Sequence, residues 1–163
     1  MNYFLKKDDF KDKTIFWDID GTLAPYRFNG YLTCGVTPKF LNDISNGVFL
    51  NRPPSKIMQR ILAEIEPNKN IIIGHYVNGR ETNDKKKWVK KYFPQITETI
   101  FVPLPESKAD IILNYCQIKE IDLKDCLFID DSIGILYDAQ EKGIPAWHIS
   151  SLMDYFDDEM FNM

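Results

Sequence analysis

Short apolar runs recur along the chain and are separated by longer stretches with helical periodicity. The runs are rich in Ile, Phe or Val and are bounded by turn residues or charges, as is typical of strands buried on both faces of a parallel sheet. We therefore expect five strands, at residues 14–17, 70–73, 99–102, 126–129 and 145–149.

The stretches between these runs carry apolar residues at the spacing of one helix face. Prolines precede the first stretch, Pro94 ends the second and Gly143 closes the last. Strands that alternate with helices predict an α/β fold with a three-layer, doubly wound (Rossmann-like) parallel sheet. The helical stripes lie at residues 57–65, 88–93, 109–116 and 135–139.

One segment departs from this alternation. Residues 23–51 mix turn residues with aromatics and show no sustained period. Because this insert follows the first strand, it lies beside the crevice in which α/β sheets bind ligands, and we expect a flap or a long loop there. A length of 163 residues suits one compact domain, so residues 1–163 are expected to form a single domain that carries the insert. The tail, residues 150–163, is expected to form a short helix.

Composition and charge narrow the class of protein. The chain is 44% apolar and 27% charged, an ordinary globular mixture, and its net charge of −4 argues against a protein that coats nucleic acid. Cys34, Cys116 and Cys126 form neither a disulfide framework nor a zinc set, which suits a reducing compartment. No apolar run approaches the roughly 20 residues that span a bilayer, and no secretory signal is visible. We therefore expect a cytoplasmic protein without a membrane partner.

A lysine-rich stretch, DKKKWVKKYF at residues 84–93, invites interpretation as a nucleic-acid patch. In a chain of negative net charge, these lysines are better explained as the solvated face of an amphipathic helix. Nucleic acid is therefore not expected as a partner.

Two acids follow the first predicted strand. Asp18 and Asp20 leave an extended backbone on the same face, and at the carboxyl end of a strand both border the ligand crevice. Mg²⁺ takes one or two carboxylates and completes its shell with waters and substrate phosphate. Gly21 permits a tight turn, and Thr22 offers a hydroxyl and an amide to a phosphate oxygen. The alternative is an Asp-rich turn that only closes the strand.

A second acidic pair, Asp130 and Asp131, follows another apolar strand. Neighbouring parallel strands direct the residues at their carboxyl ends into one crevice, where four carboxylates would repel one another strongly without a cation. Asp131 or Ser132 could cap the helix that begins near Ile133, but capping needs one such residue and does not explain two consecutive acids. Lys108 opposes the dipole of the helix that it begins, a position that favours a nearby anion. Taken alone, Lys108 also suits a plain surface lysine.

In combination these residues resemble the haloacid dehalogenase (HAD) superfamily of Mg²⁺-dependent phosphohydrolases, and the match covers most of the chain. The family's first motif, DxDGT after an apolar strand, is matched by residues 18–22. Its later lysine is matched by Lys108 and its acidic pair by residues 130–131, all in the family's order.

The resemblance implies a role for each of these residues. Asp18 would be the nucleophile that forms an aspartyl-phosphate, and Asp20 would act as general acid and then general base. Lys108 would restrain the nucleophile and the phosphate electrostatically. A Mg²⁺ ion would be held by Asp18, the main-chain carbonyl of Asp20, and Asp130 or Asp131.

One motif departs from the family pattern. The family's second motif is a strand ending in Thr or Ser, whose hydroxyl binds the phosphate, whereas this chain has Gly74 and His75 there. The side chain of His75 or Asn78, or backbone amides near Gly74, could replace that hydrogen bond, and Arg80 could clamp the phosphate. The alternative is a surface loop with an ordinary histidine. Loss of one phosphate donor is expected to slow such an enzyme without abolishing its activity.

The resemblance thus implies a Mg²⁺-dependent phosphomonoesterase, with nucleotides and sugar phosphates as candidate substrates. The insert is shorter than the cap domain of many family members. A short insert suits an open site, a phosphate exposed on a larger molecule, or enclosure by a second subunit. The alternative is a catalytically weak or silent phosphoryl-binding or interaction module, which the unusual IIIGHYV stretch at residues 71–77 favours. A signalling receiver domain is disfavoured, because its acidic pair comes early in the chain and here the pair comes last.

Overall fold

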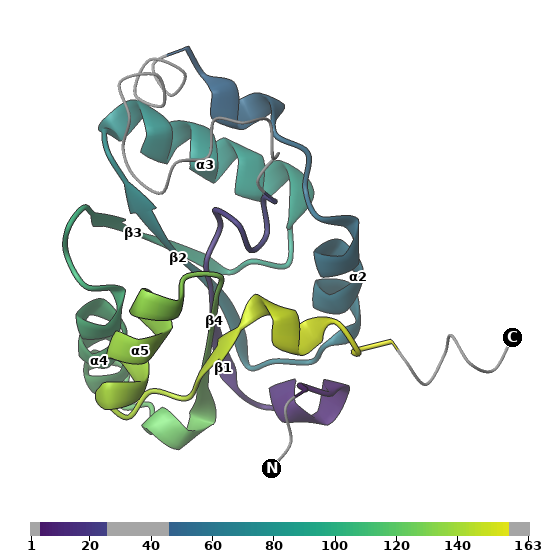
Figure 1. The fold of residues 1–163 in the computed structure, drawn as a ribbon, viewed down its shortest axis with the longest axis vertical. Coiled ribbons are helices and arrows are strands. Elements are labelled where there is room, and N and C mark those ends of the chain that lie inside the picture. The colour runs from purple at the N-terminus through teal and green to yellow at the C-terminus, as the bar shows by residue number, and fades with distance from the viewer. Residues whose placement is uncertain (1–3, 26–45, 157–163) are drawn as a thin grey trace, which may run out of the picture.

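The computed structural model describes residues 4–25 and 46–156 (Figure 1). Five parallel strands form a sheet in the order β3-β2-β1-β4-β5. They are β1 (Thr14–Trp17), β2 (Lys69–Tyr76), β3 (Glu98–Pro103), β4 (Cys126–Asp130) and β5 (Ala146–His148). All five predicted strands are confirmed, with β2 and β3 longer at both ends than predicted, β4 longer by one residue and β5 shorter.

Helices follow at the predicted stripes, and a serine or asparagine side chain accepts a hydrogen bond from the first turn of three of them. The α-helices are α2 (Lys56–Glu64), α3 (Gly79–Tyr92), α4 (Lys108–Ile118) and α5 (Ile133–Glu141). Short 3-10 helices lie at η1 (Lys7–Phe10), η2 (Val48–Asn51), η3 (Leu123–Asp125) and η4 (Ile149–Leu152). In the described ranges, none of these helices has the length and apolar character needed to cross a bilayer.

The helices form one layer on each side of the sheet, α2 and α3 on one face and α4 and α5 on the other (Figure 1). Successive residues of a strand face opposite sides, so the strands contribute to two cores. In β1, Ile15 and Trp17 pack in the core shared with α2 and α3, whereas Phe16 packs in the core shared with α4 and α5. The predicted three-layer architecture is therefore confirmed.

The centre of the sheet is a switch point, because β2 and β3 extend to one side of β1 while β4 and β5 extend to the other. Trp17 pairs with Ile129, and the amide of Asp18 donates to the carbonyl of Ile129 at 2.9 Å. The carboxyl ends of β1 and β4 therefore lie level. Open α/β sheets bind ligands at such a point.

The chain that leaves β1 and the chain that returns from the insert are bonded to each other and to α3. The amide of Ser55 donates to the carbonyl of Leu23 at 2.9 Å. Trp88 donates from Nε1 to the carbonyl of Arg52 at 2.8 Å, and its ring meets the Phe49 ring edge-on with centroids 5.5 Å apart. The return of the insert is thus fixed on the surface of α3.

Part of the insert prediction cannot be compared with the structure, since residues 26–45, including Cys34, lie outside the described residues. Cys116 and Cys126 are buried free thiols whose sulfur atoms lie 3.3 Å apart.

The tail contains the short 3-10 helix η4 followed by turns up to residue 156, and residues 157–163 lie outside the described part. One prediction from the sequence is wrong. The lysines of residues 84–93 do not all face solvent: Lys86 and Lys87 are exposed, but Lys85 is only 1% exposed. The prediction considered only the apolar residues of the helix. Lys85 can be buried because Asp20 and Glu81 form ion pairs with its ammonium group.

Phe128 on β4 is fully buried in the core that α4 and α5 cover. We expect Phe128→Ala to lower the free energy of unfolding by about 3–5 kcal/mol, because the ring leaves a cavity that the packed layers fill only in part. Urea denaturation followed by circular dichroism measures this. Ile118→Ala, on a side chain that is 67% exposed, is the control and should change stability by less than about 0.5 kcal/mol. Equal effects of the two variants would contradict the two-core description.

Candidate active site

One lysine joins acids from two neighbouring strands. Lys108, the first residue of α4, places Nζ 2.5 Å from Oδ1 of Asp18 and 2.8 Å from Oδ2 of Asp130. All three side chains are buried. Asp18 directly follows β1 and Asp130 ends β4, so the level ends of the two strands bring the acids together. Lys108 is therefore not the surface lysine of the alternative interpretation.

Asp131 completes an acidic cluster at this point. One carboxylate oxygen from each of Asp18, Asp130 and Asp131 lies within 4.8 Å of the other two. Oδ2 of Asp18 is buried and has no hydrogen-bond partner within the described part of the chain. Three acids face one lysine here, and all the donor atoms are hard oxygens. A divalent cation such as Mg²⁺ fits this donor set, because it would satisfy the buried oxygen and offset the remaining negative charge.

The pKa values of the cluster reflect this excess of acids. Burial raises the pKa of Asp18 to about 8, and Lys108 opposes the rise while Asp130 adds to it. Burial and the charge of Asp130 raise the pKa of Asp131 to about 6. Burial alone would lower the pKa of Lys108, but Asp18 and Asp130 outweigh burial and hold it above its ordinary value. Lys108 is therefore a stable cation, whereas Asp18 retains its proton near neutral pH unless a further positive charge is near, and Asp131 loses its proton at a higher pH than an ordinary aspartate.

Both oxygens of the Asp130 carboxylate accept hydrogen bonds. Its Oδ2 accepts from Lys108 and its Oδ1 accepts from the amide of Ser132 at 2.8 Å. This second contact accounts for the turn into α5. The Ser132 side chain itself makes no capping hydrogen bond.

Gly21 leaves room for Asp131. Its φ of +91° lies in the left-handed region, and a Cβ built on it would be 2.0 Å from Oδ2 of Asp131. Any side chain at position 21 would therefore displace that carboxylate. Thr22, the next residue, is buried, and its hydroxyl has no hydrogen-bond partner among the residues described.

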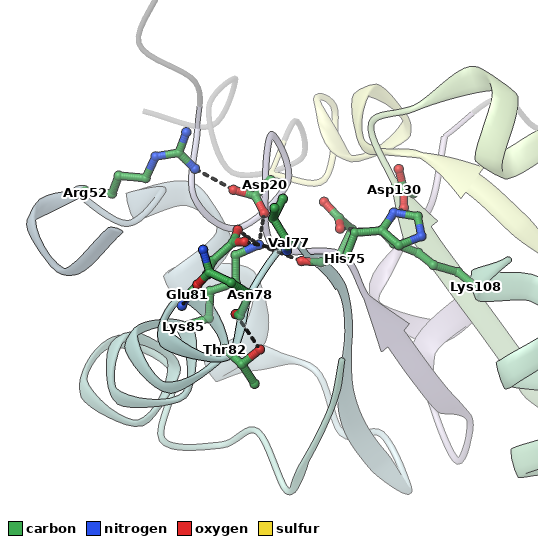
Figure 2. Close-up of polar contacts among 11 residues, drawn as sticks. Asp20, Arg52, His75, Val77, Asn78, Glu81, Thr82, Lys85, Lys108 and Asp130 are labelled. Atoms are coloured by element: carbon green, nitrogen blue, oxygen red, sulfur yellow. Dashed lines mark hydrogen bonds and ion pairs between the residues drawn. The ribbon is translucent and has the colours of Figure 1, made fainter. Parts of the chain in front are cut away.

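Asp20 lies outside the cluster of three acids and has cations of its own. Its Oδ1 is 2.5 Å from Nη1 of Arg52, and its Oδ2 is 2.6 Å from Nζ of Lys85. Figure 2 shows Asp20 grouped with Arg52, Glu81 and Lys85, apart from Lys108 and Asp130. Burial alone would raise the pKa of Asp20, but Lys85 and then Arg52 hold it below its ordinary value. The two acids of the DxDGT stretch thus have opposite electrostatic settings.

The end of β2 carries the residues predicted to replace a missing hydroxyl. His75 donates from Nε2 to the carbonyl of Glu106 at 2.9 Å, and burial lowers its pKa, which favours the neutral ring. Asn78 caps α3 by accepting from the amide of Glu81 at 3.0 Å. Gly74 is buried in β2, and Arg80 lies exposed in the first turn of α3. Their roles toward phosphate stay predictions.

Sequence reasoning missed the cations around Asp20. Arg52 lies just after the irregular insert, where no pattern marked it. Lys85 could have been found, because it lies on the same helical stripe as Trp88, Val89 and Tyr92 and four residues after Glu81, at the spacing of an ion pair. A lysine on an apolar stripe with an acid one turn earlier indicates a buried ion pair.

Comparison with known proteins finds similarity to solved structures only. No family model matches the chain, and no curated protein matches it. Among solved structures, a Lactobacillus plantarum protein provisionally named a phosphoglycolate phosphatase is similar with a TM-score of 0.61 at 14% identity, over 91% of each chain.

Two proteins from Streptococcus pneumoniae are similar to the chain as well. A hydrolase aligns with a TM-score of 0.55 at 13% identity, covering 83% of this chain and 91% of its own. A haloacid dehalogenase-like hydrolase aligns with a TM-score of 0.54 at 14% identity, covering 88% of this chain and 90% of its own. The chain therefore has the Rossmann-like fold of the haloacid dehalogenase-like hydrolases.

Proposed function

We propose that this chain is a Mg²⁺-dependent phosphomonoester hydrolase of the HAD superfamily that acts through an aspartyl-phosphate. One observation carries the proposal: Lys108 joins the acids Asp18 and Asp130 in a buried cluster with Asp131, at the switch point of the sheet. Asp18, Lys108 and the acidic pair are distant in the chain yet lie together in the structure, which supports the proposed mechanism. The shared fold supports the same interpretation.

Asp18 is the nucleophile in this proposal. Lys108 holds its Oδ1, and its Oδ2 is the buried oxygen without a protein partner. A carboxylate oxygen of Asp18 attacks phosphorus, the bond from phosphorus to the ester oxygen breaks, and an aspartyl-phosphate forms. Water then attacks that phosphorus and releases inorganic phosphate, which restores the carboxylate.

Lys108 has one donor left for the substrate. An ammonium group has three N–H donors, and Asp18 and Asp130 accept from two of them. The third can donate to an oxygen of the transferring phosphoryl group, where it stabilises the charge of the transition state. Thr22, with its unpartnered hydroxyl, is a second donor for the phosphate in this proposal.

Asp20 moves the protons. It gives a proton to the leaving oxygen in the first step and takes one from the attacking water in the second. Arg52 and Lys85 favour its ionised form, which is the form needed to activate water. The first step is then easiest for substrates whose leaving oxygen needs little protonation, such as aryl phosphates.

Asp18, the main-chain carbonyl of Asp20 and Asp131 are the residues proposed to hold Mg²⁺, with Asp130 close by. Asp131 is favoured over Asp130 because both oxygens of Asp130 already accept hydrogen bonds. When bound, the ion neutralises charge on the phosphoryl group and on the acids around it. Candidate substrates are nucleotides, sugar phosphates or a phosphate exposed on a larger molecule.

The proposal is tested by phosphate release from an aryl phosphate with and without Mg²⁺. We expect Mg²⁺-dependent turnover that Asp18→Asn lowers by at least about 1,000-fold, because no other residue takes the place of the attacking carboxylate. Asp122→Asn, on an exposed acid paired with Lys124, is the matched control and should retain full activity. Binding of Mg²⁺ and phosphate without turnover would favour a silent phosphoryl-binding module instead.

A proton and Mg²⁺ compete for the Asp18 carboxylate, so the stabilisation by Mg²⁺ should depend on pH. With a folded-state pKa of about 8 against an ordinary 3.8, Asp18 retains a proton that the unfolded chain loses above pH 4. The metal-free protein therefore loses stability as pH rises from about 4 to 8, and Mg²⁺ must displace that proton to bind. We expect 10 mM Mg²⁺ to raise the melting temperature more at pH 8.5 than at pH 6, a difference that Asp18→Asn removes. Equal shifts at both pH values would contradict this.

Gly21 offers a test of the metal site that spares every acid. A methyl group at position 21 would overlap Oδ2 of Asp131, so we expect Gly21→Ala to raise the Mg²⁺ concentration for half-maximal effect about 10- to 100-fold. Both activity and the Mg²⁺-induced rise in melting temperature report it. Gly134→Ala is the control, because a Cβ there meets nothing within 4 Å. An unchanged Mg²⁺ requirement in Gly21→Ala would argue against Asp131 as a ligand.

A further inference from the structure

Lys85 lies outside every motif that the proposed function uses, although its side chain is among the largest that are fully buried. From its contacts we infer that Lys85 is a positioning residue for Asp20, fixing the orientation of the carboxylate that transfers protons in the reaction. The inference rests on the proposed function, since it concerns the role that Asp20 plays there.

All three donors of the Lys85 ammonium are used within the protein. Nζ lies 2.6 Å from Oδ2 of Asp20, 2.7 Å from Oε1 of Glu81 and 2.7 Å from the carbonyl oxygen of His75. An ammonium has three N–H groups, so none remains for a substrate. Lys85 differs in this from Lys108, which has one donor left, and it therefore acts through Asp20.

The partners of Lys85 are themselves fixed. Oε2 of Glu81 accepts from the amide of Val77 at 2.8 Å, so this carboxylate joins the start of α3 to the end of β2 (Figure 2). The ring of Phe49 lies 5.3 Å from Nζ and closes another side. The ammonium is thus held by α3, β2 and the return of the insert independently of Asp20.

Each oxygen of Asp20 has its own cation. Arg52 contacts Oδ1 and Lys85 contacts Oδ2, so the pair defines the plane of the carboxylate as well as its position. Loss of one cation would leave the group free to rotate about the other. An error of about 1 Å in the placement of a catalytic group can lower a rate about 100-fold.

A purely structural role for Lys85 is the competing explanation. Buried ion pairs contribute little to stability in comparison with well-packed apolar residues of similar volume. A methionine at this position would fill similar space beside Phe49 but would leave the buried Glu81 carboxylate without its cation, so Lys85→Met lowers stability under either explanation. The two explanations are separated by whether the effect on the rate depends on Asp20.

The experiment is a double-mutant cycle between Lys85 and Asp20 in the full chain. Lys85→Met, Asp20→Asn and the double variant are assayed with an aryl phosphate and saturating Mg²⁺, under single-turnover conditions as well, so that slow variants still give a rate. Lys87→Met, on an exposed lysine of the same helix, is the matched control.

We expect Lys85→Met to lower kcat about 10- to 100-fold and to change KM by less than about twofold, because Lys85 contacts no substrate. In the Asp20→Asn background the same substitution should change the rate by less than about twofold. A structural role would lower the rate equally in both backgrounds, and this outcome would overturn the inference, as would an Lys85→Met variant with the kcat of the parent.

Glu81→Gln provides a second variant if Lys85→Met fails to fold. The amide still accepts from Val77 but no longer balances the charge of Lys85, and we expect a several-fold loss of kcat that disappears in the Asp20→Asn background. If the parent protein turns over no phosphate ester, the proposed function fails and the inference fails with it. If the parent is active and Asp18→Asn is not, while both Lys85→Met and Glu81→Gln match the parent, only the inference fails.

Discussion

The structure depends on the contact of one ammonium group with two carboxylates. Lys108 lies between Asp18 and Asp130 at distances of 2.5 and 2.8 Å, and without it the ends of β1 and β4 would bring uncompensated acids together in a buried place. Even with Lys108, the pKa of Asp18 stays raised, because burial outweighs a single lysine. The three acids of the site carry more negative charge than Lys108 neutralises, and a divalent cation would balance the excess.

A second buried lysine, Lys85, comes from the helical layer on the opposite side of the sheet and pairs with a different acid, Asp20. Lys108 belongs to α4, which packs with α5, while Lys85 belongs to α3, which packs with α2. Each helical layer thus supplies one buried cation to one acid of the DxDGT stretch. Asp18 shares its lysine with another acid and has a raised pKa, whereas Asp20 has two cations and a lowered pKa. Two aspartates only two positions apart therefore have pKa values shifted in opposite directions.

Much of the fold and the acidic cluster could be predicted from the sequence, because both depend on local patterns. Each strand is an apolar run, and Asp18, Asp130 and Asp131 follow such runs directly, so the parallel arrangement alone brings them together. Lys85 and Arg52 could not be placed in this way. The helical stripe and the spacing from Glu81 indicate that Lys85 is buried in an ion pair, but not that it contacts Asp20. That contact, like the position of Arg52, depends on how α3 packs against the return of the insert, a long-range contact that leaves no periodic signal.

The hydrogen bond between Ser55 and Leu23 closes the insert at its base, and Trp88 fixes the returning chain to α3. Since the entropy of closing a loop grows only slowly with its length, a change in the length of the chain between Leu23 and the returning segment that carries Phe49 and Arg52 costs the fold little. The base of the insert is therefore a natural grafting point, at which new recognition segments can be joined to this scaffold while the chemistry beneath them stays as it is.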